Sequence, residues 1–354
     1  MAVPSSLTLS YDAVLSTTLF NIKRELKDQI STNNVLLYYI MKKNKLYEED
    51  GGGDRVQIPL MHELGRADSY AGYDVLDTTP VDGITSAFYE WGQMAGSVTI
   101  SGIEERKNKG DKRILNLLKA KTKQAVLGIE DKFGRAFLQG NGVNGGNLYD
   151  QYVSPANGSV FIEPLPSLVR YDNATSDSIG NINQSTYSFW RNQVKDASAL
   201  TTYATILNAL RNQINNCGKG PGGGPDLHVA DQLGYELIER ALASFYQNTS
   251  IKTADIPFDN FTLRGKPVVW DEFVPDAYTN TVTVASGAKS TLYSLNTKTL
   301  GIKYDGEADF EPQGFQKPTD QDAKTNLILW QGVSFTDNRR KNGVTGGLKN
   351  DASS

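Results

Sequence analysis

Few residues in this 354-residue chain belong to the types that carry out chemistry. Histidine occurs only as His62 and His228, and cysteine only as Cys217. These three residues cannot build a zinc cluster at any familiar ligand spacing, and a Ser-His-Asp triad would have to use one of the two histidines. His228 lies in an apolar stretch and His62 in a loop region, so we interpret both as structural or solvated. We therefore expect no metal site, no cofactor and no enzyme activity.

Two other patterns resemble functional motifs without meeting their requirements. Asp271 and Glu272 are adjacent carboxylates, but neighbouring residues of a strand point to opposite faces, which makes them a poor acid–base pair. The segment 217–226, CGKGPGGGPD, places a lysine among glycines. A phosphate-binding loop requires G-x-x-x-x-G-K followed by Ser or Thr, and here the order differs and prolines interrupt. We interpret this segment as a flexible loop.

Composition indicates a soluble chain that can bury a sizeable core. Hydrophobic residues make up 39% of the chain, charged residues 21%, and the net charge is −4. This balance gives no support to a dedicated nucleic-acid binder, which usually carries a strong basic excess. The longest apolar run, Val35–Met41, is far too short to cross a bilayer, and no secretory signal is visible. The single cysteine excludes an intrachain disulfide and fits synthesis in a reducing cytoplasm.

The strongest pattern in the chain predicts one long helix over residues 110–140, which we call the spine helix. Asp111 is a suitable cap for its start, and Gly140 suits the position just past its end. Gly128 and Gly134 lie inside it at a cost of about 1 kcal/mol each relative to alanine, which predicts a close approach by another backbone or a bend. The apolar stripe consists of Ile114, Leu118, Ala125, Ile129, Phe133 and Phe137.

The stretch before the spine helix is rich in strands and turns. Residues 55–60 and 94–100 read as strands, and about thirty residues without a helix separate them. Such a gap is unusual inside a compact domain. A long projecting β-loop explains it, and a small β-subdomain folded back on the body is the alternative. A projecting loop would expose strand edges and aromatic side chains, which calls for a partner.

The rest of the chain predicts an α+β protein. Helical stripes occur over 11–30 and 33–43, and the second must dock either on the chain's own core or on a neighbouring copy. Helices at 201–214 and 233–245 alternate with short apolar strands, which indicates a compact α/β unit between roughly 201 and 303. The last ordered piece is a strand at 326–335, and the terminal residues, GVTGGLKNDASS, read as a tail.

Positive charge gathers around the start of the spine helix. Lys112, Lys119 and Lys123 can share the helix side opposite the apolar stripe. Such a run is usually a solvated face, but it also fits an acidic surface of a neighbouring subunit or packaged nucleic acid bound without sequence preference. Arg339 and Arg340 raise the same alternatives.

The order of segments resembles the major capsid proteins of tailed bacteriophages, which share the Johnson fold, also called the Hong Kong phage capsid fold. The phrases SFWRNQVKDAS, PDLHVADQLGYELIERALAS, RGKPVVWDE, TLYSLNTKTLGIKY and NLILWQGVSFTDNRRKNGVTGG look like segments of a subgroup of these proteins. The resemblance implies an N-terminal arm over 1–45, an extended β-loop over 46–109, and the spine helix with the first part of a peripheral domain over 110–200. It further implies an axial α/β domain over 201–303, with a return to the peripheral domain and a tail over 304–354.

The resemblance also implies a function and partners. It predicts hexamers and pentamers of an icosahedral shell around double-stranded DNA. The chain would therefore be a virion protein that assembles in the host cytoplasm. Its expected partners are a portal, a separate scaffolding protein and optionally a decoration protein, and no membrane is involved. Residues that we expect to be exposed are the candidates for contacts between subunits. Deletion of residues 65–88 is expected to leave a soluble subunit that forms no shells. The alternatives are an encapsulin-type shell, a phage tail or receptor-binding protein, and a carbohydrate-active hydrolase. The selected contact residues are Arg55, Arg66, Asp68, Trp91, Arg339 and Arg340.

Overall fold

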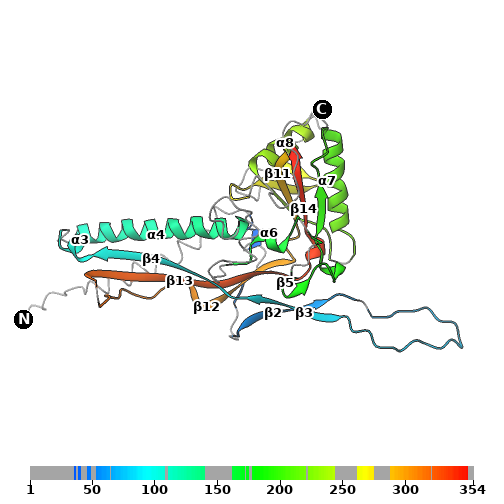
Figure 1. The fold of residues 1–354 in the computed structure, drawn as a ribbon, viewed down its shortest axis with the longest axis horizontal. Helices are drawn as coiled ribbons and strands as arrows, with labels where there is room; N and C mark the ends of the chain where they lie inside the picture. The colour runs from blue at the N-terminus through cyan, green and yellow to red at the C-terminus, as the bar shows by residue number, and fades with distance from the viewer. Residues whose placement is uncertain are drawn as a thin grey trace, which may run out of the picture.

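The structure is a computed structural model in which the chain is elongated (Figure 1). A long helix and a long sheet extend to one side, a block containing two further helices stands at the other end, and a two-stranded ribbon projects beyond that block. The described residues are 36, 39–40, 46–48, 53–63, 65–107, 111–139, 162–171, 173–174, 178–220, 222–243, 261–274, 288–319 and 321–349.

The long sheet has four strands in the order β1-β12-β13-β4. Strands β4 and β13 run antiparallel over ten residue pairs, and β12 and β13 are also antiparallel, whereas β1 joins β12 in parallel. The short helix α3 (Gly102–Lys107) follows β4 and leads back toward the long helix. The strands are β1 (Leu46–Glu48), β4 (Gly92–Ser101), β12 (Leu300–Pro312) and β13 (Ala323–Thr336).

The spine helix is confirmed as α4 (Asp111–Gln139), 29 residues long, and it lies along the four-stranded sheet (Figure 1). The second part of its predicted apolar stripe, from Ala125 to Phe137, packs in the core beside the sheet: the ring of Phe133 meets that of Trp330 edge-on at 4.9 Å between centroids. A side chain at Gly96 of β4 would collide with Ile129, so glycine allows the strand to pass directly beneath the helix. The sheet and α4 therefore form one packed unit.

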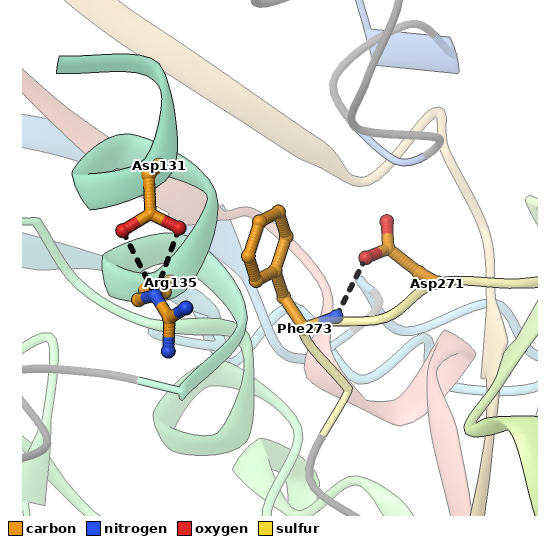
Figure 2. A network of polar contacts seen from close by, with 4 residues as sticks. All are labelled: Asp131, Arg135, Asp271 and Phe273. Atoms are coloured by element: carbon orange, nitrogen blue, oxygen red, sulfur yellow. Dashed lines mark hydrogen bonds and ion pairs between the residues drawn. The ribbon is translucent and has the colours of Figure 1, made fainter. Parts of the chain in front are cut away.

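At Gly134 the close neighbour of α4 is a side chain, whereas the sequence predicted a close approach by another backbone or a bend in the helix. A Cβ there would lie 2.6 Å from Cε2 of Phe273. Figure 2 shows Phe273 beside α4, where Arg135 pairs with Asp131 at 2.9 and 3.0 Å. The backbone N–H of Phe273 donates to Asp271 at 3.0 Å, which holds the residue in place (Figure 2). Gly134 thus makes room for the contact between α4 and the segment after β10.

The two glycines of α4 provide a matched pair of substitutions. Gly134→Ala should lower the free energy of unfolding by about 1–3 kcal/mol, because the buried Phe273 ring has to move. Gly128→Ala should raise it by up to about 1 kcal/mol, because Gly128 has open space around it and alanine favours the helix. Urea unfolding of the unassembled subunit measures both. Equal effects of the two substitutions would contradict the packing of Phe273 on α4.

A second sheet has six strands in the order β7-β14-β11-β8-β10-β9. It carries α7 (Tyr203–Cys217) and α8 (Gln232–Ala243), close to the helices predicted at 201–214 and 233–245. Ile206, Leu210 and Leu237 lie in a core cluster shared by these helices and the sheet. The strands are β7 (Gln193–Asp196), β8 (Leu227–Ala230), β9 (Phe261–Leu263), β10 (Lys266–Trp270), β11 (Ala288–Leu295) and β14 (Gly343–Lys349).

The expectation of a C-terminal tail is wrong for Gly343–Lys349. This segment is β14, a buried strand paired with β7 on one side and β11 on the other. Its glycines reflect tight packing, since a Cβ at Gly343 would lie 2.7 Å from the Cys217 sulfur and one at Gly346 would lie 2.6 Å from the Tyr171 ring. The six-stranded sheet therefore includes strands from outside the predicted 201–303 unit.

The ribbon consists of β2 (Arg55–Met61) and β3 (Ile84–Glu90), antiparallel with Met61 opposite Ile84. The sequence predicted β2 but missed β3, and the strand predicted at 94–100 belongs to the four-stranded sheet as part of β4. The remaining elements lie near the base of the ribbon or at the connections between the sheets. They are β5 (Ser178–Ile179), β6 (Ile182–Asn183), α6 (Leu165–Leu168), and the 3₁₀ turns η1 (Ser188–Trp190) and η2 (Arg339–Lys341).

The helix predicted over 11–30 lies outside the described residues, as does the predicted arm over 1–45 apart from three of its residues. Of the second predicted helix, Leu36, Tyr39 and Ile40 are described, and all three are helical and buried. They belong to the same core cluster as the apolar residues of α4 and the four-stranded sheet. Of the two docking alternatives, these residues therefore follow the first: they pack in the core of their own chain.

Candidate assembly surface

The base of the ribbon is fixed to the body of the molecule. The main core cluster, which contains the apolar residues of α4 and of the four-stranded sheet, also includes Val56 and Ile58 of β2 and Tyr89 of β3. The Tyr89 hydroxyl donates to the backbone oxygen of Thr336 at 3.1 Å, and burial raises the pKa of Tyr89, which keeps the donor protonated. The backbone N–H of Phe88 donates to the Gly180 oxygen at 3.0 Å. These contacts fix the base of the ribbon to the body.

Beyond that base, the ribbon and the loop that closes it expose apolar side chains. The loop comprises residues 62–83, and its described residues are almost all exposed. Local hydrogen bonds shape it: the Ala71 N–H donates to the Asp74 carboxylate at 2.8 Å and the Thr79 N–H to Asp77 at 2.9 Å. An exposed apolar group of this size usually marks an interaction site. The exposed apolar residues are Met61, Tyr70, Tyr73, Val75, Leu76 and Ile84.

Three of the contact residues predicted from the sequence lie on the ribbon or its loop. Arg55 of β2 is half-exposed and pairs across the ribbon with Glu90 at 3.5 Å. Arg66 forms an ion pair with Asp77 inside the loop, and Asp68 is exposed. Each of these residues is accessible from outside the chain, as a contact between subunits requires. Their role in such contacts stays a prediction.

Trp91, the fourth predicted contact in this region, lies where the ribbon joins β4. Its indole N–H donates to the Gly53 oxygen at 3.0 Å, and its ring packs partly against the main core cluster. Within the chain Trp91 therefore closes the base of the ribbon. Only its remaining exposed part is available to a neighbouring copy.

Arg339 is not exposed, which corrects the assumption on which its predicted contact role was based. Its side chain is fully buried and donates four hydrogen bonds, and its guanidinium lies 5.9 Å from the centre of the Trp190 ring. Burial lowers its pKa, but a guanidinium remains charged at neutral pH. Arg340 is exposed, as expected. The four acceptors of Arg339 are Leu168 O (2.8 Å), Trp190 O (3.0 Å), Gln184 Oε1 (3.2 Å) and Asn192 Oδ1 (3.2 Å).

The predicted basic residues all lie on α4. Lys112 and Lys119 belong to its first three turns, and Lys123 follows one turn later with its side chain exposed. Lys121 lies on another side of the helix, 3.6 Å from the Glu104 carboxylate of α3. This ion pair ties α3 to the first half of α4.

The residues that suggested chemistry each have a structural environment. His228 is fully buried in β8, shares a hydrogen bond of 3.0 Å with Ser294, and has its pKa lowered to about 4 by burial. His62 stacks on Phe189 at 4.7 Å. Burial raises the pKa of Cys217 to about 12, so its thiol is protonated at neutral pH.

The two motif-like patterns are also resolved by their surroundings. Asp271 is buried while Glu272 is exposed, so they do not face one another. The glycine-rich loop presents carbonyls to a cation: Lys341 Nζ donates to Lys219 O at 2.9 Å and Gly220 O at 3.0 Å. A phosphate site would require N–H groups pointing inward instead.

The described part of the chain contains no group of three or more potential metal-ligating side chains. Among the helices described there, none is both long and apolar enough to span a membrane.

No protein-family model matches the sequence. No curated protein matches it either.

Solved structures do match. The capsid asymmetric unit of cyanophage A-1(L) superposes with a TM-score of 0.56 at 12% identity, covering 86% of this chain and 90% of that chain. The capsid of an empty GTA particle superposes with a TM-score of 0.51 at 8% identity, covering 87% and 90%. The holo-SrpI encapsulin complex from Synechococcus elongatus has a TM-score of 0.45 at 10% identity, covering 89% of each chain. The first two matches show that this chain has the α+β capsid fold, as the resemblance implied.

Proposed function

From the premise that this chain has the fold of phage capsid proteins, we propose that it is a major capsid protein. Copies of it form the hexamers and pentamers of an icosahedral shell that encloses double-stranded DNA. The observation that carries the proposal is the projecting ribbon, whose loop exposes Tyr70, Tyr73, Val75 and Leu76 away from the core of its own chain (Figure 1). Such a surface is stable in solution when another molecule covers it.

The two ends of the molecule suit different tasks in such a shell. The α4 helix and the four-stranded sheet form a rigid slab, which we assign as the peripheral domain, and the six-stranded sheet with α7 and α8 as the axial domain. The ribbon is the extended loop, and residues 1–45 are assigned as the arm. Rings of five or six such subunits require the same heterologous contact repeated until the ring closes.

The proposed partners follow from this role. Packaged DNA would be held by non-specific electrostatics, for which Lys112, Lys119, Lys123 and Arg340 are the candidate residues. A separate scaffolding protein, a portal and optionally a decoration protein complete the proposed assembly, which forms in the host cytoplasm and ends as part of the virion. The contacts between subunits involve Arg55, Arg66, Asp68, Arg340 and the exposed part of Trp91.

Negative-stain electron microscopy of the recombinant protein at high concentration tests the proposal. Closed shells or capsomer rings are expected, with DNA inside particles isolated from infected cells. Shells filled with an enzyme cargo would instead indicate an encapsulin-type compartment, and tubes or trimers a tail or receptor-binding component. A monomer that hydrolyses glycans would contradict the proposal altogether.

A further inference from the structure

The face of the ribbon that turns toward the body continues past the end of β2 to His62. The buried residues of β2 are Val56, Ile58 and Leu60, at every second position. His62 is the next residue in this series, and its backbone N–H donates to the Gly83 oxygen at 2.9 Å, which continues the strand pairing by one step. Because alternate residues of a strand point to the same face, the His62 side chain lies on the face that carries the buried residues. This face therefore extends from the base of the ribbon to the start of its loop.

One short segment, residues 178–191, contacts this part of the ribbon at two points. We call this segment the brace; it contains the β5–β6 hairpin and the turn η1, and Figure 1 shows β5 beside the ribbon. The first contact is made by Gly180, whose backbone oxygen accepts the Phe88 N–H at 3.0 Å. The second is made by Phe189, whose ring stacks on that of His62 at 4.7 Å between centroids.

The two contacts lie far apart along the ribbon. Phe88 of β3 pairs with Gln57 of β2, and His62 follows Gln57 by five positions along the chain. At about 3.4 Å per residue, the two contacts are separated by about 17 Å. A single contact would allow the ribbon to pivot, whereas two separated contacts on one segment define its direction.

The brace is itself bonded to the interior of the body. The Trp190 indole N–H donates to the Ile179 oxygen at 2.8 Å, which joins η1 to the hairpin. Trp190, Ile179 and Ile182 are all buried in the main core cluster. The buried Arg339 donates to the Trp190 oxygen at 3.0 Å and to Gln184 Oε1 at 3.2 Å. The brace therefore has a fixed position from which it can support the ribbon.

Gly180 sets the spacing between the brace and the ribbon. Its φ of 59° and the φ of 62° at Asn181 are both in the left-handed region, as the tight turn of the β5–β6 hairpin requires. A Cβ at Gly180 would lie 2.8 Å from the Ala87 Cβ and 3.2 Å from Cζ of Tyr89. Carbon atoms in favourable contact are about 3.5–4.0 Å apart, so a methyl group here would push the ribbon away from the brace by up to about 1 Å.

We propose that the brace sets the direction in which the ribbon projects, and that this direction sets the diameter of the assembled particle. The inference rests on the proposed shell function, in which copies contact one another through the ribbon. A changed angle between ribbon and body repeats at every copy, so the same contact closes the shell at a different curvature. Gly180 and Phe189 are the positioning residues of this device.

The distance between two spin labels tests the direction of the ribbon in the unassembled subunit. Met61→Cys places one label at the far end of β2, where the side chain is 74% exposed, and Glu239→Cys places the other on the exposed side of α8. The native Cys217 is fully buried, so it stays unlabelled. Gly180→Ala should shift the peak distance by about 1–3 Å, because a small displacement at the brace grows toward the free end of the ribbon. Phe189→Ala should broaden the distance distribution, because it removes the second contact.

A compensating substitution separates the spacing from backbone strain. Gly180→Ala also places alanine at a positive φ, which destabilises the hairpin whatever the spacing. Ala87→Gly removes the opposing methyl group, so the chain with both substitutions keeps the strain and regains the space. Its label distance should return close to the wild-type value. Gly65→Ala, where no atom lies within 4 Å of the added methyl group, is the control without effect.

Negative-stain microscopy of the same chains without labels measures particle diameter. Gly180→Ala should change the mean diameter by at least about 10%, since small shifts are amplified at repeated interfaces. The chain that also carries Ala87→Gly should form particles close to the wild-type diameter. Phe189→Ala should give a wider range of diameters, because its ribbon has only one contact with the brace.

The outcomes separate the brace from the shell function. Wild-type label distances in both Gly180→Ala and Phe189→Ala, or no recovery when Ala87→Gly is added, would overturn the brace. Wild-type diameters despite shifted label distances would overturn its control of particle size. If Gly180→Ala does not fold, the label distances and diameters of Phe189→Ala decide. A wild-type chain that forms no shells would overturn the shell function, while the label distances would still test the brace.

Discussion

Replacing residues 64–81 with Asn-Gly is expected to abolish shell formation while the subunit stays folded. Glu63 and Asp82 would then flank a two-residue turn, since the His62 N–H already donates to the Gly83 oxygen at 2.9 Å. Asn-Gly is the preferred sequence for the tight hairpin turn that this pairing requires. The replacement removes Tyr70, Tyr73, Val75 and Leu76, none of which is buried. The free energy of unfolding should change by less than about 1 kcal/mol.

Negative-stain microscopy reports assembly, and urea unfolding reports stability. A control of unchanged loop length, with Tyr70, Tyr73, Val75 and Leu76 replaced by serine, separates the loss of apolar contacts from the loss of reach. Normal-sized particles from the Asn-Gly variant would rule out the loop as an assembly element. The deletion of residues 65–88 suggested by the sequence is unsuitable, because it removes most of β3 and the buried Ala87.

Arg339→Met is expected to lower the free energy of unfolding by about 3–5 kcal/mol, a large part of the stability of a typical domain, because it breaks a buried hydrogen-bond network. The substitution keeps an apolar stem of similar length but removes the donors to four buried acceptors, of which Asn192 Oδ1 keeps the Arg170 N–H as a partner. Each acceptor left without a partner costs about 1–3 kcal/mol unless water replaces the donor. These acceptors lie between α6 and the start of β7, and η2 itself connects the two sheets. Loss of Arg339 should therefore loosen the junction of the two sheets.

Urea unfolding of the unassembled subunit measures this effect. Arg340→Ala is the matched control, because its exposed side chain should change the free energy by no more than about 0.5 kcal/mol. Arg339→Lys should recover only part of the loss, since an ammonium cannot reach acceptors arranged around a planar guanidinium. Equal stability of the Arg339 and Arg340 variants would contradict the buried position of Arg339.

Local patterns were sufficient for the elements whose signal repeats along the chain. The stripe that predicted α4 depends only on residues three and four positions apart, and these same residues make the hydrogen bonds of a helix. The alternation of buried and exposed residues similarly identified β2. The strand β3 was missed because its exposed positions include the apolar Ile84 and Phe88 while its buried positions hold Ala87 and Tyr89, so no alternation of apolar and polar residues is visible. The signal that could have identified β3 is the need of β2 for an antiparallel partner strand.

Assignments that depend on distant parts of the chain could not be made from the sequence. Arg339 appeared to belong to an exposed basic run, yet its acceptor on Leu168 is 171 residues away. The glycines of β14 looked like those of a tail, because the residues that require them, Cys217 and Tyr171, precede them by more than 120 positions.

The sequence by itself therefore determined the long helix, the α+β character and the scarcity of chemical groups, since these depend on composition and short-range periodicity. Only the tertiary structure decided that Arg339 lies in the interior, that the C-terminal segment completes a sheet, and that the loop 62–83 is left uncovered. The physical reason is that burial and strand pairing are properties of contacts between segments, and these contacts exist only once the chain has folded.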